Sequence, residues 1–320
     1  MAETGKDINR AAELLMADEV VAIPTETVYG LAGNALSEVA IRKIFEVKNR
    51  PFTDPLIVHF PNLESVAHYV TEIPEVARQL LQAFSPGPLT VLLPRRPIIP
   101  DLVTNGSPLV AVRIPNHPLT IKLLQELPFP LVAPSANPFG QLSPTLASHV
   151  QASLGHKIPY VLDGGPCNIG VESTIVHVLN DYEIKVLRQG GVSEEELLSV
   201  ASLAREEQQT GIVVPGSMQS HYAPQIPLKI GQPEEFYDLV DPSAMAYLAF
   251  TTPSAHLPLE NQLILSATGN LAEAAKNLFA MLFALEKLPV KLIVADQFPD
   301  VGIGRAINDR LQRASAKRPQ

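Results

Sequence analysis

The sequence predicts an α/β protein of two domains, a large mixed sheet followed by a smaller Rossmann-like unit. Three observations predict this fold. The chain has 320 residues, the length of two average domains. Short apolar runs typical of buried strands alternate with amphipathic segments typical of helices. Residues 205–211 (REEQQTG) are polar, lack apolar periodicity and interrupt the alternation.

In the first domain, helices are predicted where capping residues precede amphipathic segments. Asp7 and Ser37 can each cap a helix, and Ser193 with Glu196 forms a capping box. The predicted helices cover residues 7–17, 37–48, 74–84, 117–127 and 193–203. The predicted strands, several closed by proline, cover residues 20–23, 56–60, 89–93, 110–114, 131–133, 160–162, 174–178 and 184–187. Short loops join some of them, so we expect both parallel and antiparallel pairs.

A second alternating pattern begins at Leu228. Long and short apolar segments predict a small Rossmann-like α/β unit. Its expected strands start at residue 228 and cover 245–250, 263–265 and 292–295, and its expected helices cover 270–287 and the segment after Gly302-Ile303-Gly304. We therefore assign residues 1–204 to the first domain, 205–226 to a linker and 227–320 to the second domain.

The composition disfavours several classes of function. The net charge is −9, whereas binding along nucleic acid needs a basic face. The single cysteine, Cys167, excludes a disulfide within the chain and a zinc site of several cysteines, and suits a reducing cytoplasm. The N-terminal residues lack the pattern of a signal peptide, and no run of roughly 18 apolar residues predicts a membrane span. We expect a cytoplasmic protein.

Four polar segments lie at the ends of predicted strands, where open α/β sheets bind their ligands. Each has an ordinary explanation as a turn, a helix end or a cap, and each also suits a binding site on loops stiffened by proline. The segments are residues 24–30 (PTETVYG), 48–55 (KNRPFTDP), 133–138 (APSANP) with 143–145 (SPT), and 163–166 (DGGP) with 170–174 (GVEST).

Cationic residues in these regions leave two interpretations open. Lys48 and Arg50 end a helix, where positive charge suits the helix dipole, but they also suit a phosphate group. Arg113 ends a strand, either as a surface salt bridge or as a contact to a carboxylate. Arg188 is either a basic residue before a glycine turn or a contact to a phosphate. Ser143 is either a binding residue or the cap of a helix that starts near Thr145.

Several familiar catalytic motifs are absent from the sequence. There is no Walker-type phosphate loop, no Gly-x-Ser-x-Gly elbow and no His-Glu-x-x-His metal motif. Cys167 has no evident base partner. The patterns alone therefore indicate a polar, cationic site suited to a small molecule that carries phosphate or carboxylate.

Seven segments, in this order, resemble the YrdC-like threonylcarbamoyl-adenylate synthases. They are PTETVYGLAGNA, IFEVKNRPFTDPLIVHF, SPGPLTVLL, VAVRIPNHP, APSANPFGQLSPT, DGGPCNIGVESTIV and VLRQGG, within residues 8–200. The later segment PGSMQSHYAP and the second α/β unit resemble the long two-domain form of the family. This resemblance implies a twisted open sheet with a large concave basin.

The resemblance implies a nucleotidyltransferase that makes threonylcarbamoyl-AMP and pyrophosphate from L-threonine, bicarbonate and ATP. That reaction is the first step towards threonylcarbamoyladenosine at position 37 of tRNA. Mg²⁺ is expected to accompany ATP, and no tightly bound organic cofactor is expected. The product would pass to a tRNA threonylcarbamoyl transferase complex, and direct contact with tRNA stays open.

The resemblance also implies roles for individual residues. Lys48 and Arg50 are the expected catalytic residues, with Arg50 at the rim of the basin. The linker carrying Tyr222 is expected to cover the site. The threonine-binding residues would be Thr27, His59, Arg113, Ala133 and Ser173, with Arg113 on the carboxylate. The ATP-binding residues would be Arg50, Asp54, Leu109, Ser135, Asn137, Ser143, Arg188 and Tyr222, although Asp54 stands where some members have asparagine.

Two other functions compete with this one. A YrdC-like domain can bind nucleotide or RNA without catalysis, but the acidic composition disfavours that role. A similar domain serves carbamoyl transfer in hydrogenase maturation, but those proteins carry cysteine-rich zinc fingers, and this chain has one cysteine.

Overall fold

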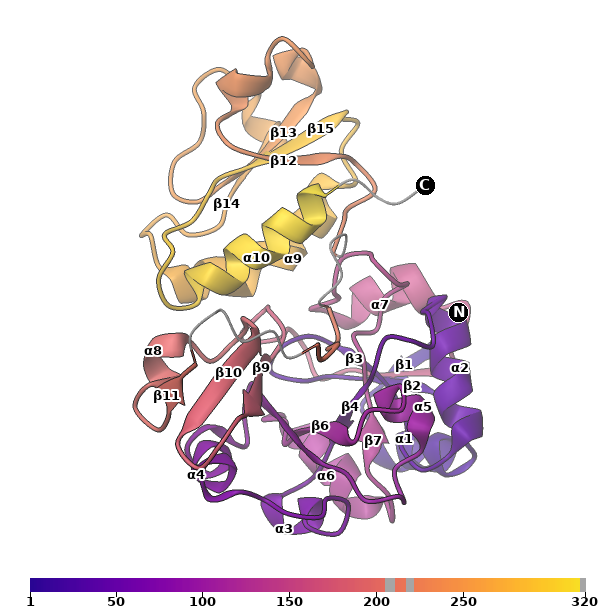
Figure 1. Cartoon of the computed structure of the whole chain (residues 1–320). Helices are drawn as coiled ribbons and strands as arrows, with labels where there is room; N and C mark the ends of the chain where they lie inside the picture. The colour runs from indigo at the N-terminus through magenta and orange to yellow at the C-terminus, as the bar shows by residue number, and fades with distance from the viewer. Residues whose placement is uncertain (205–210, 217–221, 317–320) are drawn as a thin grey trace.

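The computed structural model describes residues 1–204, 211–216 and 222–316, which form two sheets with helices packed on them (Figure 1). The described part of the first domain contains an eleven-stranded sheet with parallel and antiparallel pairs, as predicted. Its strands, in spatial order, are β1 (Glu3–Gly5), β8 (Tyr160–Leu162), β2 (Val21–Ile23), β3 (Gly30–Asn34), β7 (Leu131–Val132), β4 (Ile57–His59), β6 (Leu109–Arg113), β5 (Leu89–Pro94), β9 (Thr174–Val178), β10 (Glu183–Arg188) and β11 (Ser202–Leu203).

The helices of the first domain begin largely where capping residues predicted them. Asp7 accepts a hydrogen bond from the Arg10 amide and Ser37 from the Ala40 amide, so each satisfies a free amide of its first turn. The helices are α1 (Ile8–Met16), α2 (Glu38–Lys48), α3 (Leu63–Val66), α4 (Glu75–Phe84), α5 (Asp101–Thr104), α6 (Pro118–Glu126), α7 (Ala147–Leu154) and α8 (Glu194–Leu197).

The prediction of a long helix over residues 193–203 was wrong. The capping box between Ser193 and Glu196 does form, but α8 ends at Leu197. Residues 202–203 instead form β11, which pairs in parallel with β10. Of the four α8 residues only Leu197 is buried, so little apolar burial supports a longer helix, and pairing at the sheet edge satisfies the backbone groups.

The second domain is the predicted small Rossmann-like unit. Its described strands form a four-stranded, fully parallel sheet: β12 (Leu228–Ile230), β15 (Leu292–Ala295), β13 (Met245–Ala249) and β14 (Gln262–Ile264). Its long helices are α9 (Leu271–Leu285), capped by Asn270, and α10 (Gly304–Ser315). Short 3₁₀ helices η1 (Pro233–Phe236), η2 (Pro242–Ala244) and η3 (Leu259–Asn261) connect the strands. Residues 205–210 of the predicted boundary lie outside the described residues.

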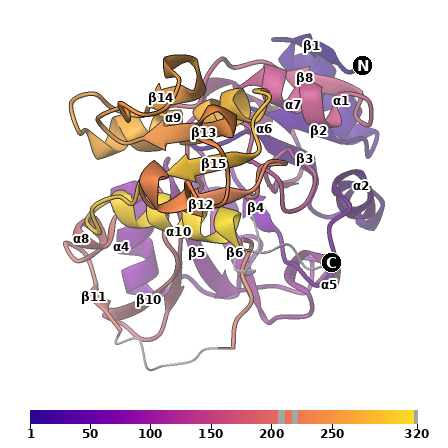
Figure 2. The ribbon, with the colours of Figure 1, turned by 90° about the horizontal axis from the view of Figure 1, so that it is seen from above.

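The two domains share a buried interface. Helices α9 and α10 lie between the two sheets, and the second domain lies over the first (Figures 1 and 2). Val28, Leu142 and Val171 of the first domain belong to the same apolar cluster as Phe279 of α9 and Ile307 of α10. Val28 and Val171 lie within the polar segments 24–30 and 170–174, and Leu142 directly precedes the segment 143–145. The second domain therefore packs directly on these three segments.

Candidate active site

Lys48 holds the loop that follows β7. It is the last residue of α2, and Asn49 then turns the chain in the left-handed conformation, with φ of 51°. Lys48 Nζ donates to the backbone oxygens of Ser135 and Asn137, both at 2.5 Å. Burial, and then the charge of Arg50, holds the pKa of Lys48 well below its usual value. The structure thus brings Lys48 together with Ser135 and Asn137.

Arg50 and Asp54 form a buried ion pair, with Nη2 and Oδ2 separated by 3.0 Å. Arg50 Nη2 also donates to the backbone oxygen of Pro55 at 2.7 Å. Neither oxygen of the Asp54 carboxylate accepts a hydrogen bond from the described residues. Burial lowers the pKa of Arg50 and raises that of Asp54, although each partner opposes the shift of the other. Arg50, expected at the rim of the basin, lines the cavity described below and is only 6% exposed.

The loop of residues 133–138 is held by backbone and side-chain contacts. Ser135 pairs with Gly30 in an isolated β-bridge, and the Ala136 amide donates to the oxygen of Tyr29 at 2.8 Å. Asn137 Nδ2 donates to the backbone oxygens of Pro138 and Gln141, both at 2.9 Å. Ala133 and Ser135 line a cavity, whereas the amide group of Asn137 supports the loop itself.

Arg113 anchors the second cluster, at the end of β6. Its Nη2 donates to Glu26 Oε1 and to Thr27 Oγ1, both at 2.8 Å, and all three residues are buried. His59, on the adjacent strand β4, is in register with Arg113. Burial, and then the positive charge of Arg113, lowers the pKa of His59 to about 3, so its imidazole is uncharged at neutral pH. The structure brings together Thr27, His59 and Arg113.

Arg188 joins Ser173 to the linker. Its Nη2 donates to the Ser173 backbone oxygen at 2.8 Å and to Ser173 Oγ at 3.1 Å, and its Nη1 donates to the Pro215 oxygen at 2.9 Å. Ser173 Oγ also lies 2.7 Å from Thr90 Oγ1. Arg188 is therefore a buried link between strand β10 and residues 211–216, and not a surface residue before a turn.

Ser143 does not cap a helix. Helix α7 begins after Leu146, which makes no capping side-chain hydrogen bond. Ser143 Oγ instead donates to Glu172 Oε1 at 2.5 Å. Burial favours a raised pKa for Glu172, but the charges of Arg310 and Arg188 and two hydrogen bonds together lower it. Glu172 and Glu26 are site residues that the sequence did not single out, although both stand within the noted segments.

These clusters surround one cavity that the linker partly fills. Its open volume is about 40 Å³, against roughly 300–1,000 Å³ for typical ligand sites. Tyr222, a linker residue in the left-handed conformation with φ of 62°, is only 1% exposed. The residues that line the cavity are Val28, Arg50, Ile57, Arg113, Ala133, Pro134, Ser135, Glu172, Arg188, Pro215, Gly216 and Tyr222.

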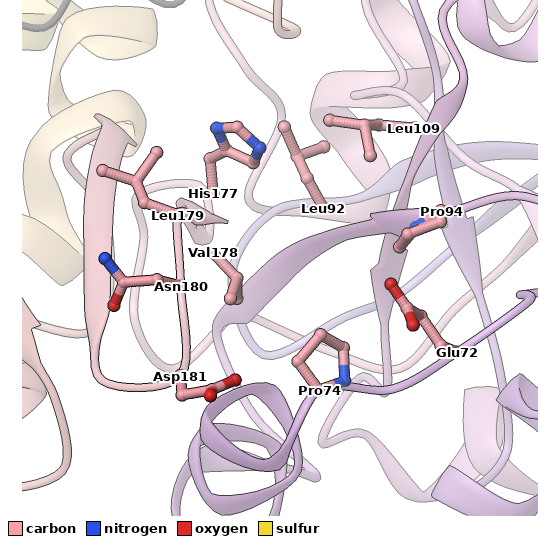
Figure 3. Close-up of a pocket in the computed structure, with 10 residues that line it drawn as sticks. All are labelled: Glu72, Pro74, Leu92, Pro94, Leu109, His177, Val178, Leu179, Asn180 and Asp181. Atoms are coloured by element: carbon pink, nitrogen blue, oxygen red, sulfur yellow. The ribbon is translucent and has the colours of Figure 1, made fainter.

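Leu109 lies apart from the rest of the predicted site. It begins β6 and Arg113 ends it, so about 13 Å of strand separates them. Leu109 lines another hollow, together with Glu72, Leu92 and His177 (Figure 3). It also lines a smaller hollow beside Val214 of the linker.

Burial raises the pKa of the Cys167 thiol to about 12, which keeps it protonated. Among the described residues, no three His, Cys, Asp or Glu side chains gather as a metal-binding group. In the same part of the chain, no helix is long and apolar enough to cross a membrane.

Comparison with known families assigns nearly the whole chain. The family model for Sua5, YciO and YrdC proteins, described as telomere recombination, matches residues 13–190. A second model, described as the C-terminal domain of threonylcarbamoyl-AMP synthase, matches residues 192–316.

Individual relatives agree with this assignment. A threonylcarbamoyl-AMP synthase of Bacillus subtilis is 37% identical, covering 97% of this chain and 93% of that protein. One of Pyrococcus abyssi is 35% identical, covering 97% and 94%. The crystal structure of P. abyssi Sua5 complexed with L-threonine superposes with a TM-score of 0.86 at 32% identity, covering 98% of this chain and 97% of that one.

Proposed function

Since the chain belongs to the threonylcarbamoyl-AMP synthase family, we infer that it joins L-threonine, bicarbonate and ATP into threonylcarbamoyl-AMP, releasing pyrophosphate and water. The observation that carries this inference is the similarity to curated synthases over 97% of the chain. The cavity supports it, because Arg50, Arg113 and Arg188 line one space. Such cations suit a substrate pair that carries a carboxylate and a triphosphate.

The threonine subsite is proposed at Arg113. Its Nε has no hydrogen-bond partner among the described residues, so the guanidinium can donate from Nε to a carboxylate while Nη2 still donates to Glu26 and Thr27. The uncharged His59 beside it would not repel the threonine amine. Ala133 and Ser173 are proposed to complete this subsite.

The reaction needs two bond-forming steps. The threonine amine attacks the carbon of bicarbonate and water leaves, which gives a carbamate. A carbamate oxygen then attacks the α-phosphorus of ATP, the bond to the bridging oxygen breaks, and pyrophosphate departs. Neither step requires a side-chain nucleophile, so the protein contributes positioning and charge stabilisation.

The triphosphate is proposed to meet Lys48 and Arg50. When protonated, Lys48 has three N–H donors, of which two serve the carbonyls of Ser135 and Asn137, and the third is proposed to donate to a phosphate oxygen. Arg50 adds a planar fork that suits phosphate. The proposed ATP site also includes Asp54, Leu109, Ser135, Asn137, Ser143, Arg188 and Tyr222.

Mg²⁺ is proposed to enter with ATP. Proteins commonly hold Mg²⁺ through one or two carboxylates together with substrate phosphates. Asp54 fits such a role, because its buried carboxylate accepts no hydrogen bond from the described residues. When bound, the ion would neutralise part of the phosphate charge.

The linker is proposed to cover the bound substrates. Pro215, Gly216 and Tyr222 line the cavity, and the open volume of about 40 Å³ requires the linker to shift before ATP can enter. Closure afterwards would exclude water from a labile adenylate.

A substrate-omission assay tests the proposed function. Pyrophosphate release should require ATP, threonine and bicarbonate together. A nucleotide-binding module without catalysis would bind ATP but release no pyrophosphate. We place the reaction in the cytoplasm, upstream of a tRNA threonylcarbamoyl transferase that consumes the product.

A further inference from the structure

The second domain places a charged side chain inside the interface between the domains. Arg310 lies on α10, on the same buried face as Ala306, Ile307 and Leu311, and is 1% exposed. Burying a guanidinium is costly unless its N–H groups are paired. Packing of α10 requires only apolar residues at such a position, so the charge needs another explanation.

The partners of Arg310 include the first domain. Its Nε donates to Glu172 Oε2 at 2.7 Å, and its Nη2 donates to the backbone oxygen of Gln189 at 2.9 Å. Its Nη1 donates to Asp309 Oδ2 at 2.5 Å, within α10 itself. The guanidinium thus spans from the second domain to two segments beside the cavity.

Glu172 carries this contact into the site. It lines the cavity, and its second carboxylate oxygen accepts the hydrogen bond from Ser143 Oγ. A continuous chain of side-chain hydrogen bonds therefore runs from Arg310 through Glu172 to Ser143, which is in the proposed ATP site. Two hydrogen bonds, one between Arg310 and Glu172 and one between Glu172 and Ser143, thus connect α10 to Ser143.

The same arginine also holds the linker tyrosine. The Arg310 Cζ atom lies 5.0 Å from the ring centroid of Tyr222, within the range of a cation–π contact. Phe279 of α9 packs against the ring as well, with centroids 5.8 Å apart. Tyr222 adopts a left-handed backbone conformation that is uncommon for a bulky residue, so it depends on surrounding contacts to stay in place.

We propose that Arg310 is a positioning residue for the ATP side of the active site, acting from the second domain through Glu172 and Tyr222. The proposal rests on the proposed function, because it assumes that Ser143 and Tyr222 meet the nucleotide. It gives the second domain a task in the reaction itself: without Arg310, Glu172 and Tyr222 lose the group that aligns them.

A second arginine on α10 provides a matched control. Arg305 Nη1 lies 2.7 Å from Glu195 Oε1, so this pair also joins α10 to the first domain. It lies at the surface, with the Glu195 side chain 51% exposed, and neither residue lines the cavity. Loss of Arg305 removes a tether between the domains and leaves the contacts of Arg310 in place.

Titration calorimetry with ATP and Mg²⁺, and separately with threonine, tests the proposal on the full-length protein. Arg310→Lys keeps the positive charge but cannot serve Glu172, Asp309 and Gln189 with one planar group. We expect its Kd for ATP to rise at least tenfold and its Kd for threonine to change less than twofold. Arg305→Gln should leave both values within twofold of the wild type. Unchanged ATP affinity in Arg310→Lys, or an equal loss in Arg305→Gln, overturns the proposal.

Two further measurements distinguish a wrong role for Arg310 from a variant that does not fold and from a wrong proposed function. If Arg310→Lys does not fold, Glu172→Gln combined with Arg310→Met removes both charges and allows the same titrations, and wild-type ATP affinity in that variant also overturns the proposal. Pyrophosphate release by the wild type is measured in parallel. Wild-type protein that binds ATP but releases no pyrophosphate contradicts the proposed function, while the titrations still decide the role of Arg310.

Discussion

Arg113 Nη2 lies 2.8 Å from Glu26 Oε1. The arginine that is proposed to bind the threonine carboxylate is thus already paired with a carboxylate of the protein itself. Glu26 also accepts a hydrogen bond from the Asn116 amide at 3.0 Å, and both members of the ion pair are buried. The pair fixes the orientation of the guanidinium before any substrate arrives. Such preorganisation lowers the cost of ordering the site on binding.

Arg113→Lys should weaken threonine binding selectively. Lysine retains the charge but loses the planar fork, and a charge-assisted hydrogen bond contributes about 1.5–3 kcal/mol, so the threonine KM should rise roughly 10- to 100-fold. Steady-state kinetics with each substrate varied in turn measures this. The ATP KM should stay within about twofold, and Arg78→Lys on the exposed surface of α4 serves as control. A selective loss of ATP affinity would show that Arg113 serves the other substrate.

Arg50→Ala should abolish turnover and also destabilise the protein. Removing one member of a buried ion pair leaves the other without compensation, at a cost of about 3–5 kcal/mol. The second variant Arg50→Ala/Asp54→Asn removes both charges, so its thermal midpoint should recover towards the wild-type value while pyrophosphate release stays lost. Recovery of turnover in the double variant would mean that Arg50 serves only to neutralise Asp54.

Substitutions of the adjacent linker residues Val213 and Val214 should differ in their effect on catalysis. Val214 is 2% exposed and packs with Ile57, Leu92, Ala111 and Ile175, whereas Val213 is 53% exposed. Burial of a valine side chain contributes about 1.5–3 kcal/mol, so Val214→Ser should loosen the cover and lower kcat/KM for ATP at least tenfold. Val213→Ser should stay within about twofold. Equal behaviour of the two variants would argue against a covering role.

His59 should make stability depend on pH in the acidic range. Burial lowers the pKa of His59 from 6.5 to about 3, so between these pH values His59 is protonated in the unfolded chain but not in the folded protein. The contribution of neutral His59 is complete above pH 6.5 and falls by about 1.4 kcal/mol per unit as the pH drops towards 3.

Urea unfolding, followed by circular dichroism at several pH values, measures this contribution. The stability difference between wild type and His59→Gln should shrink between about pH 6.5 and 4.5. A constant difference for His59→Gln would show that the imidazole is not shielded from protons.

The sequence predicted the elements whose own residues determine them. Asp7 and Ser37 cap their helices as expected, and the apolar runs before Pro24 and Pro134 form the expected strands β2 and β7. Strand β3 was missed, because Gly30-Leu31-Ala32-Gly33-Asn34 combines glycine with small residues of low strand preference. It is a strand because β2 and β7 pair on both sides of it.

The sequence named the candidate site residues but not the contacts that join them. Motif resemblance located Lys48, Arg113 and Ser143, yet no local pattern indicates that Glu172 accepts from Ser143 or that Glu26 pairs with Arg113. Those contacts join residues 29 and 87 positions apart. Arg310 is 138 positions from Glu172, so only the packing of the second domain reveals its role.

The most direct test of the central claim is to identify the product made from labelled bicarbonate. Purified protein would be incubated with ATP, Mg²⁺, L-threonine and ¹³C-bicarbonate, and the mixture analysed by mass spectrometry together with pyrophosphate. We predict threonylcarbamoyl-AMP that carries one ¹³C atom, formed in equal amount with pyrophosphate and absent when any substrate is omitted. Pyrophosphate formed without threonine, or an adenylate that lacks the label, would contradict the assignment.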